Sequence, residues 1–164
     1  DETRSPNNDE FNLTHFKNKL EQLYTPQATY KNIDLKFFIN EENRYIPFSK
    51  RKLLQIAGNL ISNAIKFTPQ GGRVTVRLDL LIQSDRNLVS VTVEDTGRGI
   101  NPSEVKKILS GSAGSTAGTG GETGYGFGLS LVKHLVENLG GNLHIDSIVN
   151  EGTIFKVELP RPNL

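Results

Sequence analysis

The sequence predicts an α+β fold in which helices cover one face of a mostly antiparallel sheet. Two observations carry this prediction. Segments of alternating hydrophobicity occur as neighbouring pairs joined by short polar turns, which is the pattern of β-hairpins. Segments with apolar residues at three- and four-residue spacing lie between them, as in amphipathic helices. The expected order is helix, strand, helix, two strands, short helix, loop, helix and two strands, so hairpins outnumber parallel crossovers.

Length and composition are those of a single domain. The 164 residues include no Cys, which excludes disulfides and cysteine–metal sites. The 19 basic and 18 acidic residues nearly cancel, which argues against a nucleic-acid binder. No apolar run approaches the roughly 18 residues of a membrane helix. The chain also lacks Met, and we expect it to be part of a longer protein, with a disordered stub at 1–10, a domain at 11–160 and a tail at 161–164.

The first third of the chain predicts a helix, a strand and a second helix. The first helix is expected from Asn12, with one apolar face made by Leu13, Phe16, Leu20 and Leu23. A short apolar run at 35–39 predicts a strand. Ser49 is a good N-cap for the next helix, and Pro69 ends that helix.

The middle of the chain predicts a hairpin followed by a short helix. Residues 74–82 and 88–94 alternate as strands do, with a polar turn between them. Asn101 and Pro102 have the types expected at the N-cap and first position of a helix, which we predict to end near Leu109.

A glycine-rich segment precedes the last three elements. Residues 110–124 contain six Gly and no large apolar side chain, so we expect a mobile loop. Gly140 and Gly141 end the helix that follows, whose apolar face is expected to contain Leu129, Val132, Val136 and Leu139. Residues 143–148 and 154–159 predict a closing hairpin.

A row of polar side chains marks the second helix. Asn59, Asn63 and Lys66 lie on one side of it, and Gln55 extends the row by one turn. Amide oxygens can ligate Mg²⁺ without cancelling the positive charge that holds phosphates, and Lys66 can contact a phosphate oxygen. The alternative for this motif alone is a solvent-exposed polar face.

Two further motifs contain closely spaced glycines. In Asp95-Thr-Gly-Arg-Gly-Ile100, a carboxylate at a strand end can accept a hydrogen bond from the amine of adenine; alone, the motif could be an ordinary turn. In Gly124-Tyr-Gly-Phe-Gly-Leu129, glycines before a helix can offer N–H groups to an anion; alone, they could be a hinge. Together with the helix motif they favour a nucleoside triphosphate with magnesium.

These motifs, in this order, resemble those of the sensor histidine kinases. The segment 59–68 resembles their N box, 95–100 their G1 box and 124–129 their G2 box, and Gly152-Thr153 resembles the distal glycine motif. The resemblance implies the Bergerat (GHKL) ATP-binding fold, a two-layer α/β sandwich with the nucleotide between helices and sheet.

The resemblance also implies ATP and Mg²⁺ as cofactors and assigns roles to the N box. Asn63 would ligate Mg²⁺, and Asn59 would line the phosphate site beside it. Lys66 would contact phosphate, and Phe67 would lie against the adenine.

The glycine boxes receive the remaining roles. Asp95 would read the adenine amine, with the base surrounded by Gly97, Gly99, Ile100 and Thr153. Residues 110–123 would form a lid over the nucleotide. Gly124, Gly126 and Gly128 would meet the phosphates, and the expected nucleotide-binding residues of this segment also include Thr123, Tyr125, Phe127 and Leu129.

The resemblance implies a protein-histidine kinase that transfers the γ-phosphate of ATP to a histidine on a dimerisation domain of the same protein. The phosphate would then pass to a response regulator receiver domain. His15 lacks the acidic setting of the phosphoacceptor, so the isolated chain is expected not to phosphorylate itself. We expect a cytoplasmic domain without nucleic-acid or direct membrane contact, monomeric alone and homodimeric in the full-length protein.

Two departures keep alternatives open. The segment 105–111 lacks the Phe of the family's F box, and the lid is unusually rich in Gly, Ser and Thr. A degenerate module that binds a partner is therefore one alternative, and a GHKL serine kinase is another. A gyrase-type ATPase would need a Glu where Asn59 stands, because an amide cannot act as a base.

Overall fold

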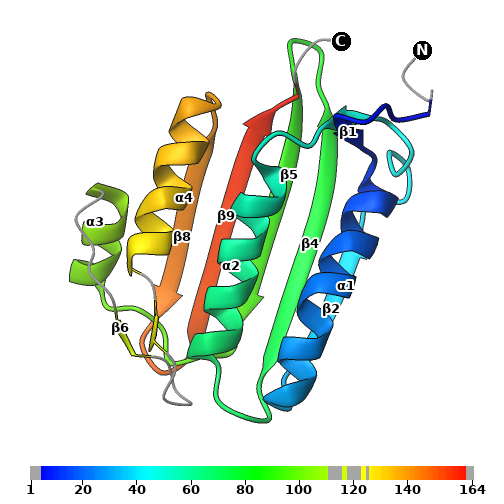
Figure 1. The fold of residues 1–164 in the computed structure, drawn as a ribbon. Helices are drawn as coiled ribbons and strands as arrows, with labels where there is room; N and C mark the ends of the chain where they lie inside the picture. The colour runs from blue at the N-terminus through cyan, green and yellow to red at the C-terminus, as the bar shows by residue number, and fades with distance from the viewer. Residues whose placement is uncertain (1–4, 111–115, 118–122, 125, 162–164) are drawn as a thin grey trace.

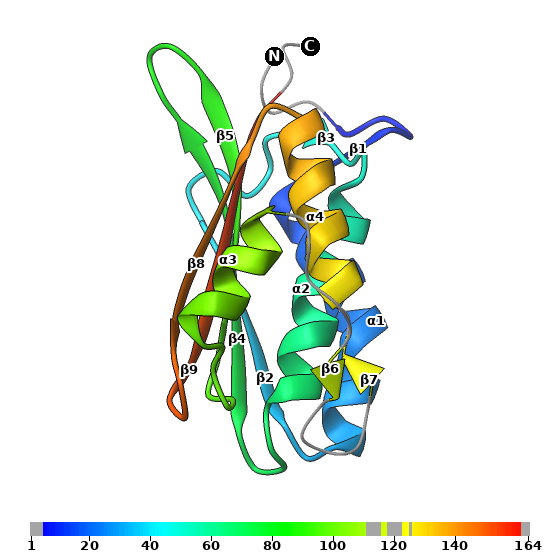
Figure 2. The ribbon, with the colours of Figure 1, turned by 90° about the vertical axis from the view of Figure 1, so that its left-hand side faces the viewer.

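The computed structural model describes residues 5–110, 116–117, 123–124 and 126–161. It confirms the predicted α+β class, because helices and a five-stranded sheet form two layers (Figures 1 and 2). The strands in spatial order are β2 (Asp34–Ile39), β4 (Arg73–Ile82), β5 (Asn87–Asp95), β9 (Gly152–Pro160) and β8 (Asn142–Ile148). Only the β2–β4 pair is parallel, and the other three pairs are antiparallel.

The helices cover one face of this sheet (Figure 2). They are α1 (Leu13–Tyr30), α2 (Leu53–Phe67) and α4 (Gly126–Asn138), with the shorter α3 (Pro102–Ser110) beside α4. Helix α1 packs on β2 and β4, α2 on β4 and β5, and α4 on β8 and β9. Within the described part of the chain, no helix has the length and apolar character needed to cross a membrane.

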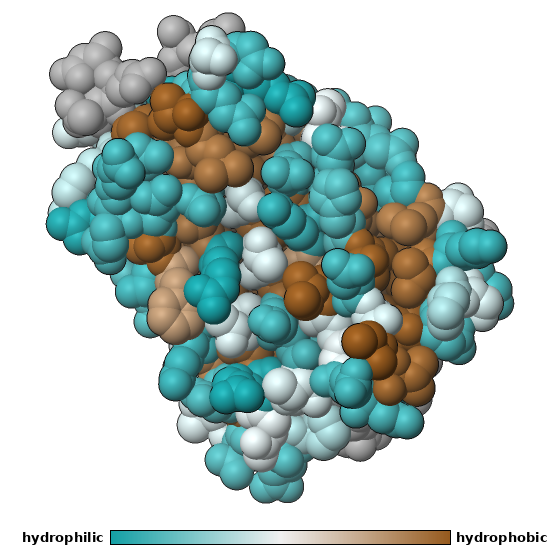
Figure 3. Space-filling model, turned by 180° about the vertical axis from the view of Figure 1, so that it is seen from behind, coloured by the Kyte–Doolittle hydropathy of each residue, from teal (hydrophilic) through white to brown (hydrophobic). Residues whose placement is uncertain are grey.

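The core lies between the two layers and follows the alternation of the strands. In β4 the side chains of Val74, Val76, Leu78 and Leu80 are buried against the helices. Arg77 lies on the opposite face, which none of the described helices covers and which Figure 3 shows to be largely hydrophilic with separate apolar patches. The two-residue period therefore sets which face of the sheet meets the helices.

Two short strands correct the predicted start of the second helix. Residues Phe48–Ser49 form β3, which pairs antiparallel with β1 (Glu10–Phe11). Ser49 is thus a strand residue, and the N-cap position of α2 is Lys52, in the left-handed region at φ 59°. The pairing prevails over the capping preference because the rings of Phe11 and Phe48 join an aromatic cluster in the core.

Two contacts lie near the ends of the described chain. Glu10 is already buried in β1, one residue before the predicted start of the domain. Near the other end, Arg161 donates from Nε to the carbonyl of Pro47 at 2.9 Å and from its backbone N–H to Asn87 at 2.7 Å.

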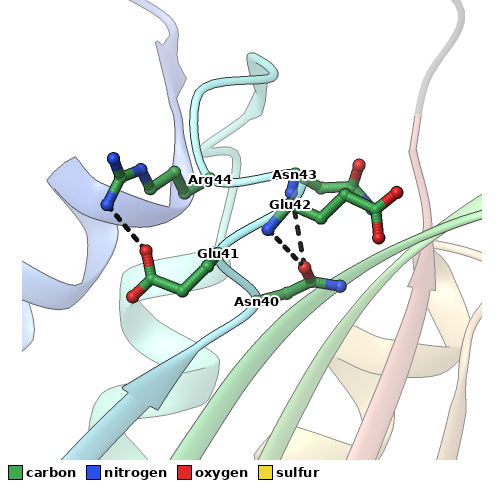
Figure 4. Close-up of polar contacts among 5 residues, drawn as sticks. All are labelled: Asn40, Glu41, Glu42, Asn43 and Arg44. Atoms are coloured by element: carbon green, nitrogen blue, oxygen red, sulfur yellow. Dashed lines mark hydrogen bonds and ion pairs between the residues drawn. The ribbon is translucent and has the colours of Figure 1, made fainter.

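The loop between β2 and β3 is organised by its own side chains (Figure 4). The Oδ1 atom of Asn40 accepts the N–H groups of Glu42 at 2.9 Å and Asn43 at 3.3 Å, and Arg44 pairs with Glu41 at 2.6 Å. The carbonyl of Arg44 in turn accepts the N–H of Thr14, so the loop satisfies one of the free donors at the start of α1. A second pair of short strands, β6 (Thr116–Ala117) and β7 (Thr123–Gly124), precedes α4.

Candidate functional site

A small cleft lies between the helical layer and the ends of β5 and β9. Residues from three regions line it, namely Asn63, Ala64 and Phe67 of α2, Asp95, Gly99, Ile100, Thr153 and Phe155 from the sheet and its loops, and Leu129 of α4. The N, G1, G2 and distal glycine motifs therefore each contribute to one cleft.

Asp95 provides the charged group of the cleft. It is the last residue of β5 and is paired across the sheet with Thr153, and its side chain is only 6% exposed. Burial raises the pKa of Asp95 from 3.8 to about 6, and hydrogen bonds from the backbone N–H groups of Gly97 and Thr153 oppose that rise. A carboxylate can accept about four hydrogen bonds, so capacity for a ligand donor remains.

The two glycines of the loop after Asp95 are required for close contacts within the protein. A Cβ atom at Gly97 would lie 2.4 Å from the carbonyl oxygen of Phe67. Gly99 has φ +74°, and a Cβ atom there would lie 2.3 Å from the carbonyl oxygen of Ile148. Both glycines are expected around the ligand base, and these backbone neighbours give each of them a structural reason as well.

The amide side chains of α2 form a ladder. Nδ2 of Asn59 donates to the carbonyl of Gln55 at 2.9 Å, and Nδ2 of Asn63 donates to the carbonyl of Asn59 at 2.8 Å. Oδ1 of Asn63 is buried and has no hydrogen-bond partner within the described residues, although the residue lines the cleft. An acceptor left in this state costs about 1–3 kcal/mol, and a donor or cation bound in the cleft would offset that cost.

This acceptor fits the predicted magnesium ligand. An amide oxygen is among the hard oxygen ligands that Mg²⁺ accepts, and Mg²⁺ in nucleotide sites takes most of its ligands from phosphates and water. Across the described ranges, no three His, Cys, Asp or Glu side chains converge on a metal position. The residues present thus suit a cation that arrives with a polyphosphate.

Phe67 and Lys66 end α2 at the mouth of the cleft. The Phe67 ring lines the cleft, and the guanidinium of Arg98 lies 4.5 Å from its centroid. A ring held in this way can offer a flat apolar surface to a base. Lys66 is half-buried in the last helical turn, outside the cleft lining, and its carbonyl accepts the ammonium of Lys31 at 2.9 Å.

Seven of the predicted site residues line the cleft, and the others are placed as follows. Asn59, Lys66, Gly97 and Gly128 are described but lie outside the lining. Thr123 and Gly124 belong to β7, and Gly126, Phe127 and Gly128 to the first turn of α4, which places the glycine run at a helix N-terminus as predicted. Tyr125 and most of the predicted lid at 110–123 lie outside the described residues.

Three residues at or beside the site were not predicted. Their positions follow from the helix sequence and from the pairing register of the β8–β9 hairpin. Ala64 follows Asn63 in α2, and Phe155 lies two residues after Thr153 and so shares its face of the sheet. Ser147 is paired with Thr153 in the β8–β9 hairpin, and its hydroxyl accepts the N–H of Ile100 at 2.7 Å. Setting the register of the closing hairpin would have found both Phe155 and Ser147.

The fold and this cleft together define the class of nucleotide-binding domain built from helices on one face of a mixed sheet. A model of the family described as "Histidine kinase-, DNA gyrase B-, and HSP90-like ATPase" matches residues 49–163. The chain belongs to this family, and within it is a catalytic and ATP-binding domain of the sensor histidine kinases.

Two similar proteins are named as kinases. The autoinducer 2 sensor kinase/phosphatase LuxQ of Vibrio vulnificus is 34% identical over 92% of this chain, and sporulation kinase A of Bacillus subtilis is 33% identical over 92%. The chain spans 18% and 23% of the lengths of these two proteins. It is therefore comparable to one domain of each.

Solved structures agree in fold and extent. The catalytic domain of histidine kinase ThkA is 27% identical, with a TM-score of 0.74 over 93% of this chain and 94% of that one. Full-length ShkA, solved in complex with AMPPNP, is 26% identical, with a TM-score of 0.68 over 90% of this chain and 29% of that one.

Proposed function

We propose that this domain binds Mg-ATP in the cleft and donates the γ-phosphate to a histidine on a separate dimerisation domain. One observation carries the proposal: two acceptors with unused capacity, the Asp95 carboxylate and Oδ1 of Asn63, line one cleft. The first matches the amine of adenine, and the second matches a cation that accompanies phosphates. The AMPPNP bound to the similar ShkA supports the same class of ligand.

Different residues in and beside the cleft bind the base and the phosphates of the nucleotide. Asp95 accepts a hydrogen bond from the base, and Phe67 and Ile100 provide apolar contact for the ring. The N-terminus of α4 offers N–H groups to the phosphates, with Lys66 on the facing helix as a positive charge. Mg²⁺ held by Asn63 would neutralise phosphate charge when it is bound.

The acceptor of the phosphate lies outside this chain in our proposal. None of the three histidines, His15, His134 and His144, is among the described residues that line the cleft. Asn59 cannot take a proton from water, so the site favours holding ATP over hydrolysing it. The partners we propose are the histidine-bearing dimerisation domain of the parent protein and a response regulator.

Two measurements test this function. Calorimetric titration with Mg-ATP should give saturable binding, and its absence would favour a degenerate partner-binding module. Incubation with γ-labelled ATP should label a dimerisation-helix fragment that carries the acceptor histidine only when this chain is present. Stable label on a histidine of this chain alone would overturn transfer in trans.

A further inference from the structure

The β8–β9 hairpin is hydrogen-bonded to the loop that follows Asp95. The backbone N–H of Asn150 donates to the carbonyl of Arg98 at 2.6 Å, and Oγ of Ser147 accepts the N–H of Ile100 at 2.7 Å. These two hydrogen bonds lie on either side of Gly99, whose backbone approaches the hairpin closely. The loop that borders the cleft is thus fixed by a segment nearly 50 residues later in the sequence.

The Ser147 hydroxyl is the centre of this junction. Besides Ile100, its oxygen lies 2.8 Å from Oγ1 of Thr153 and 3.1 Å from the carbonyl oxygen of Gly152. The hydroxyl has one proton to donate and two lone pairs that accept. The Ile100 N–H can only donate and the Gly152 carbonyl can only accept, so the direction of the contact with Thr153 follows from counting protons.

All three contacts are satisfied in one arrangement. Ser147 donates its proton to the carbonyl of Gly152 and accepts from both Ile100 and the hydroxyl of Thr153. If Ser147 donated to Thr153 instead, the contact with Gly152 would lose its proton, and a half-buried hydrogen bond would be lost. Thr153 therefore gives its only hydroxyl proton to Ser147.

The direction of this bond decides what Thr153 offers to a ligand. Thr153 is 4% exposed and lines the cleft beside Asp95. With its proton engaged, its oxygen presents only lone pairs, and the ionised Asp95 likewise only accepts. Both polar groups on this wall then favour a hydrogen-bond donor, such as a 6-amino group, at the ligand atom that faces them, and they disfavour a carbonyl oxygen there.

We infer that Ser147 is a positioning residue for base selection: it holds the Thr153 hydroxyl as an acceptor and fixes the Ile100 loop, so that the site prefers a 6-amino to a 6-oxo purine. The inference rests on the proposed function, because it concerns the base of the same nucleotide. ATP and inosine triphosphate are the appropriate probes, since they differ only at position 6 and in the proton that N1 of inosine carries.

The test is calorimetric titration of both nucleotides, with Mg²⁺ present, into four proteins. The wild type should prefer ATP. Ser147→Ala should reduce the ratio of the two affinities by about fivefold, because the freed Thr153 hydroxyl can rotate and donate to the 6-oxo group. Ser147→Thr retains a hydroxyl and should keep the ratio. Ser90→Ala, which removes a serine hydroxyl from β5 outside the cleft lining, is the matched control and should change nothing.

A fifth and a sixth protein show whether Ser147 acts through Thr153. Thr153→Val removes the hydroxyl that Ser147 orients, so adding Ser147→Ala to it should change the ratio less than Ser147→Ala does alone. An unchanged ratio in folded Ser147→Ala, or fully additive effects in the double variant, would overturn the inference.

Amide hydrogen exchange of Ile100 provides a readout that needs no nucleotide. Protection should be lost in Ser147→Ala and kept in Ser147→Thr, and equal protection in both would contradict the positioning role. If the wild type binds neither nucleotide, the proposed function fails, and the Ile100 amide alone then decides whether Ser147 holds the loop.

Discussion

Oδ1 of Asp95 accepts the backbone N–H of Gly97 at 2.8 Å inside a buried turn at the end of β5. The bond favours the charged carboxylate, yet burial outweighs it and raises the pKa of Asp95 to about 6. Each tenfold change in an acid constant corresponds to about 1.4 kcal/mol, so an ionised Asp95 at neutral pH destabilises the ligand-free fold by about 3 kcal/mol. The protein thus holds a charge that its own fold disfavours.

The first prediction concerns stability and pH. A carboxyl whose pKa is raised by folding stabilises the fold below its unfolded pKa, and this contribution is lost as pH rises through the folded value. The free energy of unfolding of the wild type should therefore fall, relative to that of Asp95→Asn, by about 2–2.5 kcal/mol between about pH 4 and pH 7. Urea unfolding of both proteins over this range measures the difference, and a constant difference would show that Asp95 has an ordinary pKa.

The second prediction concerns nucleotide binding by the same pair of proteins. Asp95→Asn replaces one acceptor oxygen by an amide, which removes a charge-assisted hydrogen bond and should lower ATP affinity about tenfold or more at neutral pH. Calorimetric titration checks this value. Equal ATP affinity in a folded variant would contradict the assignment of Asp95 to the base.

The third prediction is that the wild type binds ATP progressively more weakly below about pH 6, because protonated Asp95 is no longer an anionic acceptor. The terminal phosphate also gains a proton near this pH. Asp95→Asn is therefore the matched control, since its affinity reports the phosphate alone. Parallel pH profiles for the two proteins would refute the role of Asp95 ionisation.

Local patterns were sufficient to predict most of the fold, and long-range pairing was not. The alternation in β4 and β5 and the apolar stripe of α2 are properties of short windows, so their bounds were close to those observed. The β1–β3 pair joins residues that are 37 and 39 positions apart. Nothing within a short window distinguishes Ser49 in such a strand from Ser49 as a helix cap.

The same distinction applies to the candidate site: residues in local motifs could be predicted, and residues placed by long-range pairing could not. Asp95, Asn63 and Thr153 could be predicted because each belongs to a motif whose residue types are chemically unusual for their position. Ser147 is an ordinary strand residue, and its importance arises only from the register that places it opposite Thr153. The close approach of Gly99 to Ile148 likewise depends on a contact between distant segments.

The fourth prediction tests the unpartnered oxygen of Asn63. Asn63→Leu keeps a similar volume and removes a buried acceptor that has no hydrogen-bond partner in the described structure, so the ligand-free protein should lose little or no stability. ATP affinity in the wild type should rise when Mg²⁺ replaces a chelator. In the variant, this rise in affinity should be about tenfold smaller. Titrations with and without Mg²⁺ measure it.

Asn18→Leu, at an exposed position of α1, is the control for the change of amide to alkyl and should retain the full effect of Mg²⁺. If Asn63→Leu retains it too, Asn63 is not a ligand of the cation. A large loss of stability in Asn63→Leu would mean instead that its bond to Asn59 dominates.

The fifth prediction concerns Lys31, at the end of α1. Its ammonium donates to the carbonyls of Ile65 at 3.1 Å and Lys66 at 2.9 Å, which belong to the last turn of α2 and lack helical partners. Lys31→Met keeps the length of the side chain and removes these donors, so the free energy of unfolding should fall by about 1–2 kcal/mol. Lys36→Met removes only an exposed pair with Asp34 at 3.7 Å and should change stability by less than about 0.5 kcal/mol. Because Lys66 and Phe67 end the same helix, Lys31→Met should also weaken ATP binding, and equal stability and affinity in the two variants would show that α1 does not support the mouth of the cleft.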